Sequence, residues 1–316
     1  MLRLFASFLR KWTLPVAMIA GVVMYFVYVN LHFLDATHTL ANRVLSIVQP
    51  ALIFTMLLLT FCKVDHRDLK FCKWHVYGLL FQIVLFCLCA WIILLLPQDS
   101  HFDIVIEGGM LCLICPTATA AAVVTNKLGG NPATLTTYTI LINFCIAIII
   151  PVFVPLLHPA DNHTFIQDFT LIITKVFPLL FFPFVLAQIL KRYCPRITEK
   201  LISIPDLAFY LWAIALCLAI AVTTRSIVHT SCSGIYLFGI ALASLFACVI
   251  QFAFGRYIGR KHNDLISATQ SLGQKNTVFA IWMGYTFMEP VTSIAGGFYS
   301  IWHNAYNSYQ LYKRNK

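Results

Sequence analysis

Charged side chains are scarce in this chain of 316 residues. Asp, Glu, Lys and Arg make up 11% of it, against roughly 25% in soluble domains, whereas hydrophobic residues make up 60%. Asp and Glu are absent from the middle of every long hydrophobic segment. Because a soluble globule could not bury so much apolar surface, the composition excludes that class and predicts a polytopic membrane protein.

The chain also lacks the motifs of catalysis and of nucleic-acid binding. No paired carboxylates, nucleophile-base motif or nucleotide-binding loop stands out, so an enzyme is not expected. The net charge of +10 comes from short clusters between apolar runs, which argues against a nucleic-acid partner. Cys112 and Cys115 form a CxxC without a second pair or a histidine cluster, so neither a zinc site nor another cofactor is expected.

Apolar runs of about twenty residues, the length that crosses a bilayer, recur along the chain. The helices predicted from these runs are 12–31, 44–62, 76–96, 105–125, 133–157, 168–190, 205–224, 234–258, 265–284 and 290–311. The predicted fold class is therefore an all-α polytopic membrane protein with ten transmembrane helices, and the lipid bilayer is one of its partners.

Basic residues test this arrangement independently. With a cytoplasmic N-terminus, the loops on the opposite side hold only Arg43 and Arg225, while Lys175 and Lys275 lie within predicted helices. The remaining Lys and Arg residues all fall on the cytoplasmic side, which is the bias that membrane proteins follow. The sequence thus predicts a multi-pass protein of the plasma membrane, or of a bacterial inner membrane, with both termini in the cytoplasm.

Two of the predicted helices are interrupted. Pro116 breaks the fourth, and the polar stretch 272–276 (LGQKN) breaks the ninth. These breaks fall at equivalent places if helices 1–5 and helices 6–10 are two copies of one repeat. Because each copy has an odd number of helices, the second copy begins on the opposite side of the membrane and is inverted. Interrupted segments at matching places of inverted repeats are the best sequence indication of a transporter's binding site.

Lys275 lies inside the second of these breaks, too far from either end of its apolar segment to reach water easily. A lone ammonium at membrane depth is costly and is by default a candidate for a functional site.

Three motifs carry a resemblance to a known family. Residues 115–120 (CPTATA) are similar to a CPGGxAS segment, 273–277 (GQKNT) to a GMQNS segment, and 298–304 (FYSIWHN) to FSxWHN. The chain resembles the bile acid:sodium symporter family over most of its length. The resemblance implies that helices 4 and 9 cross in a core domain, residues 76–157 and 234–311. It also implies a panel domain, residues 1–62 and 168–224, with the substrate between the two.

The same resemblance assigns residues to the crossing. The crossing-region residues are Thr117, Thr119, Gly273, Lys275, Asn276 and Thr277. Thr117 and Thr119 either line the binding cavity or satisfy the broken backbone. Asn276 is expected to cap the second half of helix 9.

The sodium ligands implied by the resemblance are largely replaced. The equivalent positions are Gln82, Ala121, Ala122, Leu135, Thr139, Ser271, Gln274 and Lys275. Where the family has a Ser-Asn pair, this chain has Ala121 and Ala122. The Glu shared by the family's two sodium sites is replaced by Ser271, and a Gln is replaced by Lys275. Another Gln and a Thr of the family are retained as Gln82 and Thr139. Hard cations need an oxygen-rich shell, so this divergent member is expected to lack a sodium site.

Three roles for Lys275 stay open at this point. In the first, its ammonium replaces the cation and bonds to Gln82, Ser271 or the backbone carbonyls that the helix breaks leave unpaired. In the second, the side chain carries a proton. In the third, it contacts an anionic substrate directly. The function predicted is secondary transport of a small organic anion by alternating access, independent of sodium. Its alternatives are a proton-coupled or sodium-coupled organic anion symporter, and a non-transporting membrane receptor or sensor of the same fold.

Overall fold

The computed structural model describes residues 13–31, 37–97, 100–160, 163–204 and 207–314. Thirteen α-helices and two short 3-10 helices, η2 and η3, make up most of this described part. Their bounds are α2 Thr13–Asn30, α3 His38–Cys62, η2 His66–Asp68, α4 Lys73–Leu95, α5 Asp103–Ile114, α6 Ala121–Leu128, α7 Pro132–Leu157, α8 Phe165–Tyr193, α9 Pro195–Ser203, α10 Leu207–His229, α11 Gly234–Lys261, α12 Leu265–Gly273, α13 Thr277–Phe287, η3 Pro290–Ser293 and α14 Ile294–Arg314.

Seven of the described helices are long and apolar enough to cross a membrane, namely α2, α3, α4, α7, α8, α10 and α11. This confirms the all-α class and supports a multi-pass membrane protein. The predicted fourth helix is divided into α5 and α6, and the predicted ninth into α12 and α13, each too short to cross alone. Both predicted interruptions are therefore confirmed.

Helix ends differ from the prediction by a few residues in most places. The largest difference is at α3, which begins at His38 rather than residue 44. The sequence analysis missed the short helix α9, whose Pro195 lies at the start, where its fixed backbone favours a helix. Two predicted helix starts, at residues 12 and 205, lie outside the described residues. So do the basic residues near the N-terminus, Arg3, Arg10 and Lys11.

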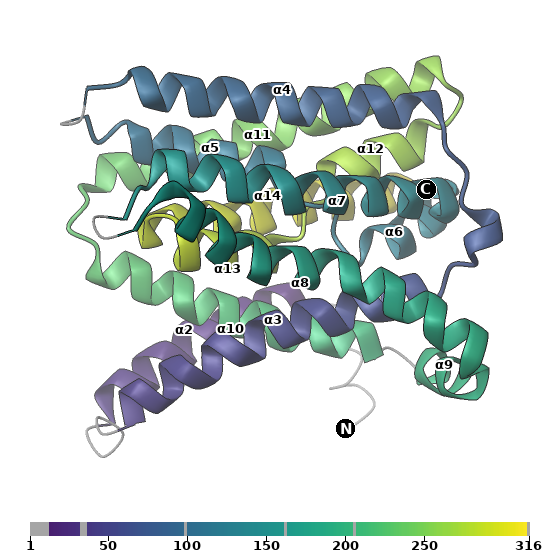
Figure 1. Cartoon of the computed structure of the whole chain (residues 1–316), viewed down its shortest axis with the longest axis horizontal. Coiled ribbons are helices and arrows are strands. Elements are labelled where there is room, and N and C mark those ends of the chain that lie inside the picture. Colours follow the sequence, from purple (N-terminus) through teal and green to yellow (C-terminus); the bar gives the residue numbers. More distant parts are fainter. Residues whose placement is uncertain (1–12, 32–36, 98–99, 161–162, 205–206, 315–316) are drawn as a thin grey trace.

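The helices are arranged in layers around the two divided ones (Figure 1). Helices α2, α3 and α10 lie together on one side, and α4 and α11 lie on the opposite side. Between them run α5, α7, α12, α13 and α14, with α10 packing against α13, α14 and η3, and α7 packing against α8. The short helices α6 and α12 contact α7 and each other.

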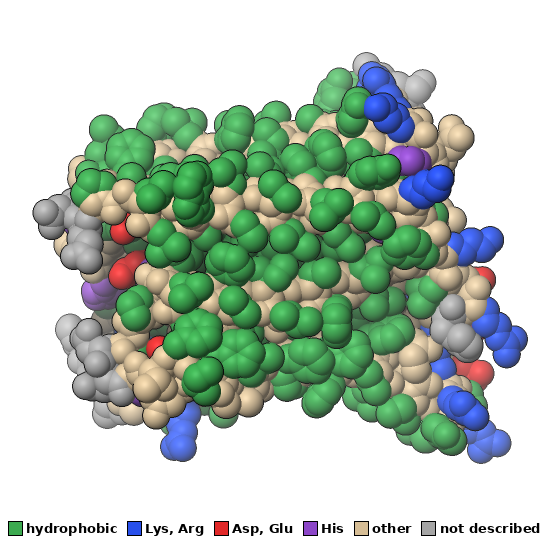
Figure 2. Space-filling model, turned by 45° about the horizontal axis from the view of Figure 1, so that its top comes forward, with side chains coloured by type: hydrophobic (Ala, Val, Ile, Leu, Met, Phe, Trp, Pro, Cys, Tyr) green, Lys and Arg blue, Asp and Glu red, His purple; other side chains and the backbone are tan. Residues whose placement is uncertain are grey.

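The surface has a hydrophobic belt with unlike ends. Hydrophobic side chains cover the middle of the visible face (Figure 2). Most of the visible Lys and Arg gather at one end, together with some Asp and Glu, while the other end shows Asp and Glu with few basic side chains. We call these the basic end and the acidic end. The acidic end includes Asp103, Glu107 and Glu289, which lie near His158, and Asp168, which accepts from the amide of Ala160.

One of these acidic residues corrects the sequence analysis. Glu107 is only 3% exposed, although no buried carboxylate was expected in the hydrophobic segments. It lies in the second turn of α5, close enough to the helix start to be taken for an end residue. Its partners, which come from distant parts of the chain, allow its burial.

Candidate functional site

The site is built on the two segments that separate the half-helices. Residues 115–120 connect α5 to α6, and residues 274–276 connect α12 to α13. The chain leaves the helix at Cys115, because Pro116 has no amide hydrogen to continue it and disfavours the helical conformation of the residue before it. Non-helical backbone at membrane depth is tolerated where other protein groups satisfy it.

Here the two segments satisfy each other. Thr117 and Lys275 form an isolated antiparallel β-bridge. The amide of Ala118 donates to the carbonyl of Gln274 at 2.9 Å, and the amide of Asn276 donates to the carbonyl of Pro116 at 2.8 Å. The crossing of the two broken helices is therefore a backbone-paired junction that fixes the position of Lys275.

Two side chains complete the junction. The Thr117 hydroxyl donates to the carbonyl of Ser271 at 2.8 Å, across the crossing. The Asn276 side chain accepts from the amide of Phe279 at 3.2 Å and so caps α13 as predicted. Of the two roles left open for Thr117, the geometry therefore favours satisfying the broken backbone. Thr119 is half-buried and lines a pocket.

Lys275 is buried at the crossing, with 1% of its surface exposed. Its backbone amide donates to Nδ1 of His303 on α14 at 3.3 Å. Its amine lies near the thiols of Cys112, Cys115 and Cys248, on α5, the α5–α6 segment and α11. Nζ has no hydrogen-bond acceptor among the described residues. The expected bonds from this amine to Gln82, Ser271 or freed carbonyls are therefore not formed.

Gln82 instead belongs to a buried network that the sequence analysis missed. Its amide nitrogen donates to the carbonyl of Leu113 at 2.6 Å, and its oxygen accepts from the Tyr138 hydroxyl. The amide nitrogen of Gln251 lies 3.1 Å from the Tyr299 oxygen, and the Tyr299 hydroxyl donates to the carbonyl of Gly273 at 2.9 Å. The network ties α4, α5, α7, α11 and α14 to the end of α12.

The cation-site equivalents come together without forming an oxygen shell. Six of them lie on α4, α6, α7 and α12, and Gln274 and Lys275 follow α12, which contacts each of the other three helices. Ala121 and Leu135 are buried and offer no side-chain oxygen, and the Thr139 hydroxyl donates to the carbonyl of Leu135 at 3.0 Å. Among the buried side-chain oxygens at these eight positions, only the Ser271 hydroxyl and the Gln274 amide oxygen have no hydrogen-bond partner in the described structure. A hard cation needs more oxygens than these.

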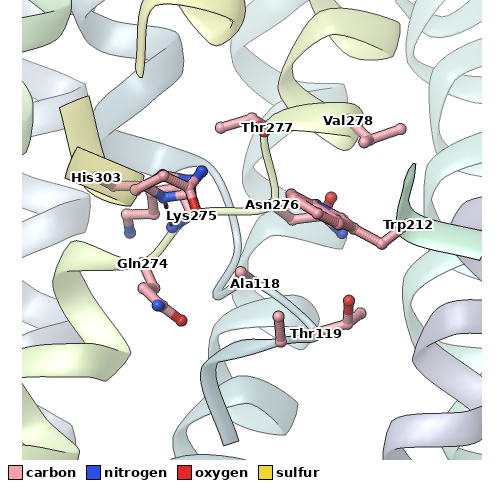
Figure 3. A pocket seen from close by; sticks show the side chains of 11 residues that line it. Ala118, Thr119, Trp212, Gln274, Lys275, Asn276, Thr277, Val278 and His303 are labelled. Atoms are coloured by element: carbon pink, nitrogen blue, oxygen red, sulfur yellow. Dashed lines mark hydrogen bonds between the residues drawn. The ribbon is translucent and has the colours of Figure 1, made fainter. Parts of the chain in front are cut away.

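A small pocket of about 30 Å³ lies on the face of the crossing that is turned toward α10. Its walls include the α5–α6 segment, the 274–278 stretch, Trp212 of α10, and His303 and Asn304 of α14. Figure 3 shows Asn276 and Trp212 on one side of the unwound segment, and Lys275 and His303 on the other. The sequence predicted Thr119, Asn276 and Thr277 at this place but missed Trp212, which comes from a distant helix.

Two helix N-termini bring partial positive charge to this pocket. Helices α6 and α13 both begin at the crossing, so the positive ends of their dipoles meet there. The backbone amides of Thr119 and Ala120 donate to no acceptor within the described residues. Glu107, by contrast, lies eight residues before Cys115, about 12 Å away along a helix.

Comparison with known proteins supports one family. The sequence profile of the SBF-like CPA transporter family, which is related to the bile acid:sodium symporters, matches residues 14–298. No protein of curated function matches the chain significantly. The profile covers both helix breaks and ends at the first residue of the third motif, and it confirms the resemblance found in the sequence.

Proposed function

This chain belongs to the SBF-like CPA transporter family, and we propose that it is a secondary transporter that carries a small organic anion across the membrane. The observation that carries this proposal is the backbone-paired crossing of two broken helices, beside a pocket that faces α10. Such crossings are where secondary transporters bind their substrates.

In this proposal, the helix pair α5 and α6 crosses the bilayer once, and so does the pair α12 and α13. Together with α14 and the seven long helices they give ten passages, arranged as two inverted five-helix repeats with both termini in the cytoplasm. The matching places of the two breaks and the gathering of Lys and Arg at one end support this topology. Residues 76–157 and 234–311 would form the core domain, and 1–62 and 168–224 the panel domain.

Alternating access follows from the size of the pocket. A volume of about 30 Å³ holds about two water molecules, far less than an organic anion needs. Trp212 closes the pocket from the panel side, and α10 also packs on α13, α14 and η3. Substrate binding therefore requires α10 to move away from the crossing. If α10 and the crossing separate first at one end of the molecule and then at the other, the substrate enters from one side of the membrane and leaves on the other.

The substrate is proposed to be a carboxylate or sulfonate, without coupled sodium. Three features attract an anion to the pocket: the N-termini of α6 and α13, the free backbone amides of Thr119 and Ala120, and the charge of Lys275. Lys275 would supply the positive charge that a bound cation supplies elsewhere in the wider family. Because its side chain lies on the opposite side of the segment from Trp212, it would act through its charge rather than by direct contact.

A ligand screen tests this proposal. Thermal unfolding of the purified protein is measured with a panel of carboxylates and sulfonates, since a ligand of the folded state raises the unfolding temperature. The best ligand is then tested for uptake into proteoliposomes. Stabilisation followed by uptake is expected. Stabilisation without uptake would indicate a receptor instead, and a panel without any stabilising anion would contradict the proposed substrate class.

Trp212→Ala is expected to weaken binding of that ligand by up to about tenfold, because the indole forms the panel wall of the pocket and an aromatic contact contributes roughly 0.5–1.5 kcal/mol. Trp91→Ala is the matched control, since Trp91 is 60% exposed on α4 and away from the pocket. Equal affinities of the two variants would place the ligand elsewhere.

A further inference from the structure

A buried carboxylate joins three segments at the acidic end. Glu107 Oε1 lies 2.5 Å from Nε2 of His158, the residue that follows α7. The other carboxylate oxygen, Oε2, accepts from the Thr292 hydroxyl of η3 at 2.9 Å. The Glu107 side chain is 5% exposed, whereas that of His158 is 27% exposed. Water therefore reaches the histidine but scarcely the carboxylate.

The η3 segment held by this carboxylate is also a contact with α10. Ser293, next to Thr292, lies with its hydroxyl oxygen 3.5 Å from that of Ser226 on α10. Helix α10 and η3 pack against each other along this line. Glu107 thus anchors η3, which follows α13 and packs against α10 at the acidic end.

Further carboxylates surround the pair. Glu289 comes immediately before η3, and Asp103 begins α5, and both act on His158 together with Glu107. Burial by itself lowers the pKa of His158, but the hydrogen bond and charge of Glu107, with the charges of Glu289 and Asp103, raise it above its usual value of 6.5. The carboxylates therefore favour the protonated, positively charged form of His158.

We propose that Glu107 and His158 form a proton-binding site that keeps η3 docked on α10 while the histidine is protonated. When the proton leaves, the carboxylates of Glu107, Asp103 and Glu289 lose the positive charge of His158 near them, and their mutual repulsion weakens the hold of α5 on η3. The described structure corresponds to the docked form. On the proposed function, this site controls the opening of the acidic end, so a change in pH on that side alters transport.

The sign of the pH dependence follows from the raised pKa. A histidine whose pKa is raised on folding contributes its full stabilisation below about pH 6.5, and this is lost as the pH rises through the raised pKa. Docking of η3 should therefore be stronger in mildly acid solution than in alkaline solution.

Amide hydrogen exchange of residues 288–296 tests the proposal without any substrate. Protection factors are compared at about pH 6 and about pH 8, each normalised to the intrinsic exchange rate, and a fall of about tenfold is expected in the unsubstituted protein. In His158→Gln the protection should be low at both pH values, because the residue cannot gain a charge. Thr292→Val should also lower it at both.

His163→Gln is the matched control. His163 Nδ1 lies 2.8 Å from Asp168 Oδ1 at the same end, but this pair is more exposed and lies on and just before α8, away from η3. The control should keep the pH dependence of the unsubstituted protein. Protection that is unchanged between the two pH values, or lost equally in His163→Gln, overturns the proton site. The exchange experiment does not depend on transport. If the protein shows this pH dependence but no uptake, the proton site is supported and the proposed transport function is contradicted.

Discussion

Lys275→Met is expected to fold at least as stably as the unsubstituted protein and to lose most of its transport. Lys275 is 1% exposed and its amine has no hydrogen-bond acceptor among the described residues, so removal of the amine breaks no hydrogen bond. Replacing a buried charge with an apolar chain of similar volume is neutral or raises the free energy of unfolding by about 1–3 kcal/mol.

The loss of transport follows from the charge. At an effective dielectric of about 20, a unit charge about 7 Å from a bound carboxylate contributes about 2 kcal/mol, or about thirtyfold in affinity. An incoming anion also supplies the counter-charge that the amine lacks in the protein itself. Lys275→Gln, which restores the residue of the wider family, should show the same loss of affinity because it too is neutral.

Lys175→Met is the matched control for this experiment. Lys175 also lies within a long helix, but it is exposed, with Nζ 5.6 Å from the centroid of the Phe287 ring. Thermal unfolding, ligand affinity and uptake are measured for all three variants. A marked loss of stability in Lys275→Met with unchanged ligand affinity would mean that the amine is structural.

Gly273→Ala is expected to lower the free energy of unfolding by about 2–3 kcal/mol and to abolish most transport, because the site is overpacked. A Cβ at this position would lie 2.2 Å from Cδ1 and 2.3 Å from Cε1 of Phe252. The ring cannot easily move, since it is 5% exposed and packs against Tyr306 with centroids 4.4 Å apart. Gly273 must then shift, and its carbonyl is the acceptor of Tyr299.

Two further variants separate this clash from the general effect of alanine. Gly234→Ala should be tolerated, because nothing lies within 4 Å of a Cβ built there. Combining Gly273→Ala with Phe252→Ala should cost less than the sum of the two single changes, because the second change removes the ring that clashes. Additive losses in the double variant would show that Phe252 is not the obstacle.

Local signals in the sequence were enough to locate the breaks. Pro116 and the polar stretch 272–276 each interrupt an apolar run, and both mark segments that are unwound in the structure. The burial of Lys275 followed from its distance to either end of that run. The cap by Asn276 was also predictable, because it depends only on residues within one turn.

Features that depend on distant contacts could not be predicted in the same way. Tyr138 and Gln82 are 56 positions apart, and Gln82 and Gln251 are 169 apart, so no spacing reveals their network. The direction of the Lys275 side chain is equally hidden, because an irregular segment has no repeating face. Glu107 was overlooked because its partner His158 lies 51 positions away.

Uptake with sodium replaced by choline tests the central claim most directly. Proteoliposomes containing the purified protein are loaded and diluted in choline buffer or in sodium buffer, and uptake of the best ligand from the anion screen is followed in both. The proposed mechanism predicts equal initial rates, because Ala121, Ala122 and Leu135 offer no side-chain oxygen to a sodium ion and Lys275 supplies the positive charge. Uptake that requires sodium would contradict it.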